Sequence, residues 1–311
     1  MRKFVFKLII VLAGIFIIDI LVGLVGVQII KKLNEKNYTG EAALFGYKLE
    51  AVKTDILILG SSTACCHYIP SILKDSINAC LHKDFDAFNA GATFQQPNYS
   101  YCVLKSVLSR KVPSIVILDI QPQQLGEKAK PAALHFLHPY YSINPNVKEV
   151  LEAHESFDNK ICLKSAMYRF NVEIFKLIMS FGNSVGTDGF MPKKGKIEQY
   201  AFFQDKDSNK LNEVMADEFE ETLSMAKEHN IKLFVSLSPR LYYPDRDSES
   251  FKKIVELCDK YTIPILDFTK DDDFQKGDLF FDTGHLNYEG AELLTNKTFQ
   301  KIKEELIQKP F

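Results

Sequence analysis

One stretch of the chain, residues 55–70, combines a short apolar run, a turn and a helix-compatible segment. It reads DILILGSSTACCHYIP. A short apolar run that ends at a turn residue is typical of a buried strand, and such strands occur in parallel sheets that carry helices on both faces. Because Gly60 follows the run directly, the stretch predicts a strand, a tight turn and a helix in immediate succession.

Two hydroxyl groups, those of Ser61 and Ser62, occupy this predicted turn. The backbone N–H groups at a helix N-terminus are unpaired, and the helix dipole is positive there. Such a position favours an anion, including the oxyanion that forms when a carbonyl is attacked. Serine is also a preferred N-cap residue. The stretch alone therefore leaves a catalytic serine and a plain N-cap both open.

Strands and helices are expected to alternate along most of the chain after residue 54. Alternation at this spacing is typical of a parallel sheet with helices on both faces. We therefore expect an α/β fold, a three-layer α/β/α sandwich of about five parallel strands, with ligands at the carboxyl ends of the strands. The expected strands are 56–59, 86–89, 114–120, 231–237 and 264–268, and the expected helices are 71–81, 99–109, 211–230, 248–261 and 288–307.

A long section between the third and fourth expected strands interrupts the alternation. It contains several Pro and Gly residues and helix-like pieces near 146–156 and 164–181, but no strong strand. We expect residues of about 127–205 to form an insertion or a lid over the sheet.

The N-terminal segment predicts a membrane anchor. Residues 8–30 are apolar apart from Asp19 and Gln28, and they are long enough to span a bilayer as a helix. A secretory signal peptide has a shorter apolar core and a small-residue cleavage site, so we expect one uncleaved transmembrane helix. The expected domains are an N-terminal tip with the anchor at 1–32, a linker at 33–53 and the α/β domain at 54–311.

Membrane orientation depends on the charges that flank the apolar run. Basic residues lie on both sides of it, but the first flank carries the free N-terminus and no acid. This favours a cytoplasmic N-terminus and an extracytoplasmic α/β domain. Asp19 within the run is costly in a membrane. It could pair with another helix or be protonated, but the interpretation that we favour is that a strongly apolar anchor tolerates one Asp.

Charge and cysteine usage exclude some classes of function. The formal net charge is −2, so there is no global basic field for nucleic acid. None of the six cysteines forms a CxxC pair, and the spacing of Cys65 and Cys66 suits no metal site. An even count permits disulfides without requiring them. We expect Cys65 and Cys66 to be small buried side chains.

An acid–imidazole pair lies near the other end of the chain, in the segment FDTGHLNYEGA at 281–291. Asp282 and His285 are three residues apart on one short loop. An Asp so placed can hold the His Nδ1–H, and the His can then accept a proton from a serine hydroxyl. Alone, the pair also fits a loop Asp that caps a turn beside an exposed His. Its conjunction with the strand–Gly-Ser-Ser–helix stretch favours a serine nucleophile.

With both motifs, the chain resembles the SGNH (GDSL-type) hydrolases and acyltransferases, especially the membrane-anchored bacterial group with Gly-Ser-Ser. The resemblance covers about residues 54–126 and 230–305 and implies an SGNH, flavodoxin-like sandwich. It implies Ser62 as nucleophile, His285 as general base and Asp282 as its partner. It also implies an oxyanion hole from the N–H groups of Ser62 and Gly91.

The third motif of the family departs from its usual pattern. The family normally has Gly-x-Asn-Asp, whose Asn side chain donates to the oxyanion, and this chain has Asp119-Ile120-Gln121-Pro122. Gln121 could donate with its longer amide. Two further residues stand near the expected site: Arg240, at the end of the fourth strand, could meet an anionic substrate or form a surface ion pair. His67 is expected to be a packing or supporting residue.

The resemblance implies a serine esterase or O-acyltransferase that acts on acetyl or other acyl esters of cell-envelope carbohydrate, with no metal or organic cofactor. The expected partners are the lipid bilayer, a carbohydrate ester and, by the same resemblance, a membrane acyltransferase, with no nucleic acid. The competing hypothesis is a catalytically weak or inactive envelope protein that binds glycan or assembles with such a partner.

Overall fold

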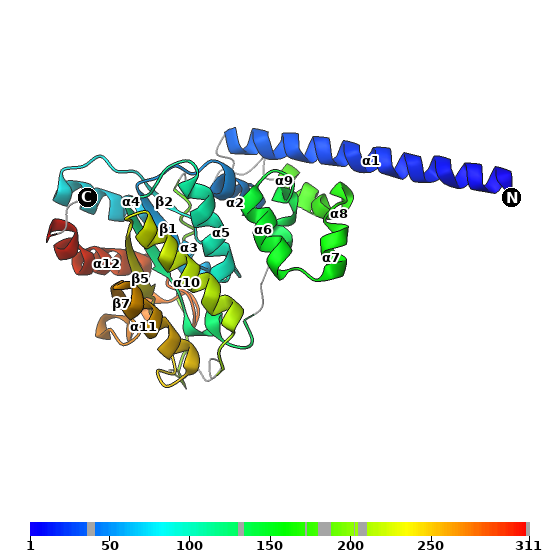
Figure 1. The fold of residues 1–311 in the computed structure, drawn as a ribbon. Helices are drawn as coiled ribbons and strands as arrows, with labels where there is room; N and C mark the ends of the chain where they lie inside the picture. The colour runs from blue at the N-terminus through cyan, green and yellow to red at the C-terminus, as the bar shows by residue number, and fades with distance from the viewer. Residues whose placement is uncertain are drawn as a thin grey trace. The chain divides into compact units, whose positions relative to one another are not determined.

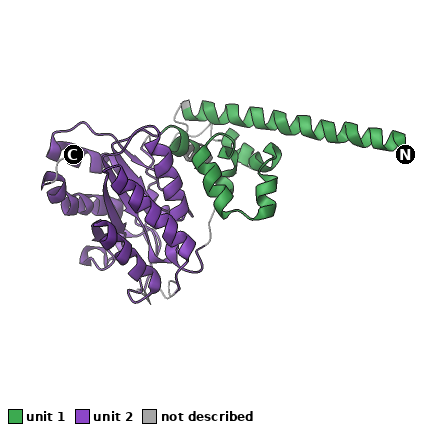
Figure 2. Cartoon of the chain, viewed as in Figure 1, with its two compact units in different colours: residues 1–51, 133–185 green, residues 52–132, 186–311 purple. Residues whose placement is uncertain are grey.

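The chain divides into two compact units in the computed structural model (Figure 2). Unit 1 comprises residues 1–51 and 133–185, and unit 2 comprises residues 52–132 and 186–311. The structure describes residues 1–35, 41–129, 134–171, 173–179, 188–201, 203–204 and 210–308. The predicted insertion at 127–205 contributes to both units, and parts of it and of the predicted linker (36–40, 130–133, 172, 180–187, 202 and 205–209) lie outside the described residues.

Unit 2 contains the predicted parallel sheet. Its five strands pair in the order β2-β1-β3-β5-β7, and every pair is parallel. The strands are β1 (Ile56–Leu59), β2 (Ala87–Asn89), β3 (Ile115–Asp119), β5 (Lys232–Leu237) and β7 (Ile265–Asp267). The α/β fold class is therefore confirmed, and each strand agrees with its predicted range to within one residue at either end.

Helices cover both faces of this sheet (Figure 1). The helices α4 (Pro70–Leu81) and α12 (Tyr288–Gln308) pack against each other on one face. On the other face lie α5 (Pro97–Leu108), α10 (Glu213–Glu228) and α11 (Glu249–Tyr261). All four side chains of β1 are buried, as expected of a strand covered on both sides.

The alternation of side chains along each strand supplies a core to each face. On the α4 and α12 face, Ile56 and Ile58 belong to one cluster with Leu73 and Leu294. The intervening Leu57 points to the opposite face and is equally buried. The sheet is thus fixed from both sides around β1.

The order of the strands places a topological switch beside β1. The chain passes from β1 to β2 on one side of it and then crosses to β3 on the other. In open α/β sheets, ligands bind outside the carboxyl ends of the strands at such a point. The Gly60–Ser61–Ser62 turn directly follows the carboxyl end of β1.

Two short features differ from the sequence expectation. The helix after Ser61 is interrupted: α3 (Ser62–His67) ends before Tyr68, and α4 begins at Pro70, a residue that suits the first turn of a helix. A two-stranded sheet of β4 (Phe203–Gln204) and β6 (Tyr242–Tyr243) was not predicted, because strands of two residues are too short to show a periodic pattern.

Unit 1 is helical in its described part. Among the described residues, α1 (Arg2–Glu35) is the one helix long and apolar enough to cross a membrane. A signal sequence near an N-terminus can have the same length and apolar composition. The unit also contains α2 (Glu41–Glu50), α6 (Pro145–His154), α7 (Phe157–Cys162), α8 (Ala166–Phe170) and α9 (Glu173–Met179).

The 3₁₀ turns of the two units include Pro122–Leu125, Leu134–Phe136, His138–Tyr140, Asp272–Phe274 and Gly277–Leu279.

Candidate active site

The turn between β1 and α3 positions Ser62. Gly60 has a φ of 136°, and a Cβ there would lie 2.4 Å from the carbonyl oxygen of Asp119, so only glycine fits. Ser61 is the N-cap of α3, but its hydroxyl lies 3.2 Å from Thr63 Oγ1 and makes no capping bond. Ser62 is the first helical residue, so the two neighbouring serines occupy different positions.

His285 and Asp282 lie beside Ser62. The His285 Nε2 is 2.8 Å from the Ser62 Oγ, across 223 positions of sequence. The His285 Nδ1 is 2.9 Å from one carboxylate oxygen of Asp282 and 3.0 Å from the other. Because a carboxylate can only accept, it fixes the Nδ1–H tautomer and leaves Nε2 as the acceptor for the serine proton. The structure thus brings the three predicted side chains together in the predicted order.

The loop that carries Asp282 and His285 is held by its own backbone. The Asp282 Oδ1 accepts hydrogen bonds from the N–H groups of Gly284 and His285, each at 2.8 Å. Phe281 N–H donates to the His285 carbonyl at 2.8 Å. Burial acts to raise the pKa of Asp282, but the hydrogen bonds from His285 and Gly284 outweigh it and hold that pKa below its ordinary value. Asp282 therefore stays ionised beside the imidazole.

A buried side chain, His67, binds the backbone of this loop. It is fully buried, and its Nε2 accepts the Leu286 N–H at 3.0 Å. Burial, followed by the charges of His285 and Arg240, lowers the pKa of His67 well below its ordinary value. His67 is therefore neutral, and its supporting role agrees with the sequence expectation.

A buried polar cluster around Asp119 lies at the carboxyl ends of β3 and β5. The Asp119 carboxylate accepts hydrogen bonds from Thr63 Oγ1 and from both the hydroxyl and the N–H of Ser238. The Tyr68 hydroxyl lies 3.4 Å from Asp119 and donates to Ser236 Oγ at 2.7 Å. Burial raises the pKa of Asp119 to about 6, against the opposing effect of Ser238 and Thr63.

Sequence reasoning missed this cluster, although a signal was present. Asp119 ends an otherwise apolar strand, and Ser238 directly follows the neighbouring β5. Polar residues at adjacent carboxyl ends of parallel strands meet at one edge of the sheet. Because Thr63 follows Ser62, the cluster holds the first turn of α3.

Two of the predicted oxyanion donors have other partners in the structure. The Gly91 N–H donates to Asn89 Oδ1 at 3.0 Å, and the Gln121 Nε2 lies 3.5 Å from the Ser238 carbonyl oxygen. Asn89 also donates through Nδ2 to the carbonyls of Ala64 and Tyr68, which fixes the end of α3. The oxyanion roles of Gly91 and Gln121 stay predictions, because each group would have to share or exchange its present partner.

Arg240 lies on the loop after β5, next to the loop of Asp282. The neighbouring Leu241 N–H donates to the Thr283 carbonyl at 3.0 Å. The Arg240 guanidinium donates to the Tyr242 hydroxyl and lies 5.2 Å from the centre of its ring. A substrate-rim role for Arg240 stays a prediction. The aromatic partner Tyr242 is neither of the two alternatives that the sequence suggested.

The cysteines near Ser62 do not compete as nucleophiles. All six cysteines of the chain are free thiols, and Cys65 and Cys66 are buried, as expected. The contact between their sulfur atoms, at 3.6 Å, and burial raise the pKa of the Cys66 thiol far above its ordinary value. A thiol held protonated is a poor nucleophile.

Part of the predicted insertion runs along the site within unit 2. Met191 N–H donates to the Cys65 carbonyl at 2.8 Å, and the Lys193 carbonyl accepts the Tyr288 N–H at 3.1 Å. Lys193 also lies over the Phe281 ring, 5.7 Å from its centre. Residues 188–201 therefore flank α3 and the Asp282 loop, while the lid function stays a prediction.

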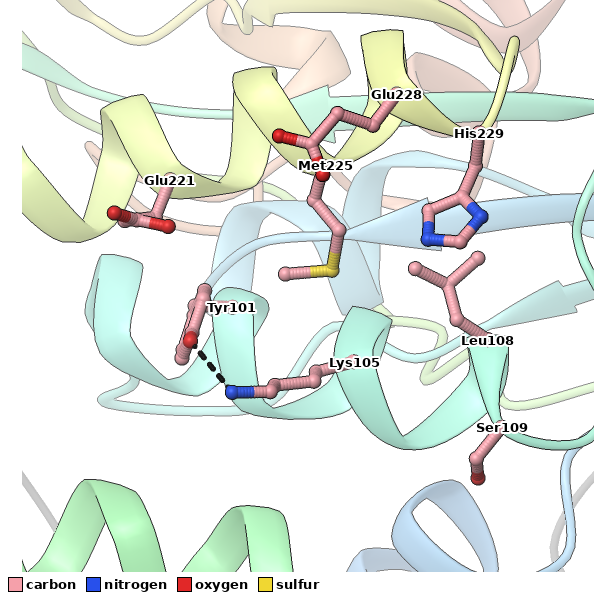
Figure 3. A pocket seen from close by; sticks show the side chains of 8 residues that line it. All are labelled: Tyr101, Lys105, Leu108, Ser109, Glu221, Met225, Glu228 and His229. Atoms are coloured by element: carbon pink, nitrogen blue, oxygen red, sulfur yellow. Dashed lines mark hydrogen bonds between the residues drawn. The ribbon is translucent and has the colours of Figure 1, made fainter.

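A separate groove of about 460 Å³ lies between α5 and α10 (Figure 3). It contains none of the predicted site residues and lies toward the amino ends of the strands, because α5 ends and α10 leads into β5 there. Lys105 donates to Tyr101 at 2.9 Å on one wall. Its lining residues are Tyr101, Lys105, Leu108, Ser109, Glu221, Met225, Glu228 and His229.

Comparisons with known proteins yield structural likenesses only. No protein family model and no curated protein sequence matches the chain. The psychrotrophic esterase EstA from Pseudoalteromonas sp. is similar at 12% identity over 81% of this chain and 97% of its own, with a TM-score of 0.44.

Two further solved structures are similar at the same level. The acetyl xylan esterase AlAXEase matches at 16% identity over 79% of this chain and 99% of its own, with a TM-score of 0.39. The SGNH-hydrolase family esterase AlinE4 matches at 13% identity over 82% and 98%, with a TM-score of 0.37. At these scores the likenesses assign no family and no activity, and the function has to be argued from the site itself.

Proposed function

We propose that this chain is a membrane-anchored serine esterase or O-acyltransferase of SGNH type. The observation that carries the proposal is the continuous chain of contacts from Ser62 Oγ to His285 Nε2 and from His285 Nδ1 to Asp282. A serine hydroxyl is a weak nucleophile until a positioned base accepts its proton. The buried supports at His67 and Asp119 hold both halves of this site.

In the proposed reaction, Ser62 Oγ attacks an ester carbonyl while His285 Nε2 takes the hydroxyl proton. His285 then gives this proton to the departing alcohol, and the acyl group remains on Ser62 as an ester. Water or a sugar hydroxyl attacks the acyl-enzyme, His285 takes the proton of the attacking group, and Ser62 is released with its hydroxyl restored. Asp282 orients the imidazole and stabilises its charged form.

The proposed substrate is an acyl ester of cell-envelope carbohydrate, with the α/β domain outside the cytoplasm. The apolar α1 supports attachment to a membrane, and the Lys193 and Arg240 side chains near the site could meet polar or anionic groups. A membrane acyltransferase that supplies acyl groups is the partner that this hypothesis would require for transfer. None of the proposed steps uses a metal or an organic cofactor.

The experiment is labelling of the full-length chain in detergent with a fluorophosphonate probe, beside turnover of a short aryl acetate. The variant Ser62→Ala should lose both signals, and His285→Ala should lower the labelling rate by on the order of 10²–10⁴. Ser61→Ala is the matched control, because its hydroxyl contacts Thr63 and not His285. A folded wild type that neither labels nor turns over would refute the serine-enzyme proposal.

A second candidate function is a glycan-binding or assembly module with little catalysis. The present partners of Gly91 and Gln121 favour it, because fewer preorganised donors are then aimed at an oxyanion. Removal of one such donor costs on the order of 10²–10³ in rate. Absence of labelling and of turnover of any tested ester in a folded chain, together with glycan binding that survives Ser62→Ala, would select this candidate.

A further inference from the structure

Unit 1 carries a second group of uncovered apolar side chains besides those of α1. They lie on the three consecutive short helices α7, α8 and α9, and each is between 45% and 76% exposed. They are Phe157, Ile161, Met167, Phe175, Ile178 and Met179. Soluble proteins rarely leave so many large apolar side chains uncovered within one short segment, and such groupings mark contact surfaces.

Asp19 joins these helices to α1. Its carboxylate accepts hydrogen bonds from Ser165 Oγ at 2.6 Å, Met167 N–H at 2.8 Å and Ala166 N–H at 3.1 Å. The first N–H groups of a helix have no partner within it. The one charge in the apolar run 8–30 and the unpaired start of α8 therefore satisfy each other. Of the sequence alternatives for Asp19, pairing with another helix is the one that the structure has.

Close packing continues along the same side of α1. A Cβ on Gly23 would lie 3.0 Å from the Ala166 Cβ, and a Cβ on Gly26 would lie 2.3 Å from the Phe170 ring. Small residues of this kind let helices approach each other closely in a membrane. The contact with α8 thus extends over two turns of α1, beyond the Asp19 carboxylate.

The position of Asp19 along α1 fixes the depth of α8. Counted from Leu8, Asp19 lies about 16 Å along the helix, and the hydrocarbon layer of a bilayer is about 30 Å thick. A membrane position that buries residues 8–30 therefore also takes the start of α8 below the headgroups. A free carboxylate would be costly at that depth, whereas one with three donors is satisfied.

We propose that α7, α8 and α9 are embedded in the same membrane leaflet as the C-terminal half of α1. Their six exposed apolar side chains would contact the lipid acyl chains. This inference rests on the membrane anchorage in the proposed function. It assigns the lipid bilayer as the partner of part of residues 133–185, which lie within the section of about 127–205 predicted from sequence to be an insertion or a lid.

The test uses single tryptophans in the full-length chain, which has none of its own. The variants Phe157→Trp and Phe175→Trp report on the proposed lipid-facing helices, and Phe16→Trp reports on α1. Phe94→Trp is the matched control, because Phe94 is a similarly exposed phenylalanine (72%) in unit 2, and Val214→Trp is a second one. Each variant is reconstituted into phosphatidylcholine vesicles with and without brominated acyl chains.

We expect brominated lipid to quench Phe157→Trp and Phe175→Trp about as strongly as Phe16→Trp, with blue-shifted emission. Aqueous acrylamide should quench Phe94→Trp and Val214→Trp instead. Quenching of Phe16→Trp by brominated lipid without quenching at 157 and 175 would overturn the inference alone. Absence of quenching at all three would overturn the anchorage as well, while the labelling of Ser62 would still decide the catalytic proposal.

Discussion

The imidazole of His67 accepts a hydrogen bond from the backbone N–H of Leu286, at 3.0 Å. His67 ends the short helix that begins at Ser62, and Leu286 directly follows His285. The rings of His67 and His285 meet edge to face, with their centres 6.2 Å apart. The segments that bear the nucleophile and the base are thus joined twice: by the contact between Ser62 and His285 and by the buried hydrogen bond between His67 and Leu286.

Replacing His67 should weaken the site without touching the reacting groups. His67→Phe leaves the buried Leu286 N–H unpaired, which costs about 1–3 kcal/mol of stability. We expect a lower midpoint of urea unfolding and slower fluorophosphonate labelling of Ser62. His67→Gln keeps an acceptor and should lie between this variant and the wild type. Equal labelling rates in all three proteins would show that the buried contact does not position His285.

Asp119→Asn should change the dependence of stability on pH. Burial raises the pKa of Asp119 to about 6, above the ordinary value of about 3.9. Between about pH 4 and pH 6 the folded state therefore binds a proton that the unfolded state releases, so the Asp119 contribution to stability falls as pH rises, by at most about 3 kcal/mol. Asparagine does not titrate, so the variant lacks this fall.

The measurement for Asp119 is urea unfolding of the full chain in detergent at pH 4.5 and pH 7. The free energy of unfolding of the wild type minus that of Asp119→Asn should be smaller at pH 7 than at pH 4.5. Thr63→Val serves as a control, because it removes one hydrogen-bond donor from the carboxylate and leaves the titrating group in place. An identical difference at both pH values would contradict the prediction.

Gly91→Ala should displace α3. A Cβ at residue 91 would lie 2.6 Å from the Ala64 Cβ and 2.6 Å from the Cys65 backbone nitrogen, so the helix that begins at Ser62 has to move. Overpacking of this kind costs about 1–3 kcal/mol, and we expect slower labelling of Ser62 as well.

Gly284→Ala is the matched control for Gly91→Ala. Its new Cβ would meet only the Asp282 Oδ1, at 3.6 Å, which is an ordinary contact. The φ of Gly284 is not positive, so an alanine there causes no backbone strain. The two variants should therefore differ in unfolding midpoint and in labelling rate, and similar losses in both would point to a general sensitivity of the loops rather than to the packing of Gly91 on α3.

Most of the sheet was predictable because its longer strands are compact apolar runs bounded by turn residues, as in 56–59 and 232–237. The proximity of Ser62 and His285 followed from motifs, since no spacing rule brings together loops 223 positions apart. The Asp119 cluster was not predicted. The positions of Asp119 and Ser238 at the ends of neighbouring strands indicate that the two residues meet, but the contact of Asp119 with Thr63 depends on the path of α3. The pairing of Asp19 with α8 likewise depends on a contact between residues far apart in the chain.

Asp19→Leu should loosen the start of α8 although it makes α1 more apolar. The change removes the acceptor of Ser165 Oγ and of the Ala166 and Met167 N–H groups. A loss of about 1–3 kcal/mol corresponds to roughly 5–150-fold faster amide exchange at residues 166 and 167. Hydrogen–deuterium exchange of the full chain in lipid nanodiscs measures this, with the amides of α12 as internal reference.

Asp19→Asn keeps one acceptor oxygen and should show a smaller increase. Because leucine favours membrane insertion, faster exchange in Asp19→Leu cannot result from a weaker anchor, and unchanged exchange would mean that the carboxylate does not hold α8.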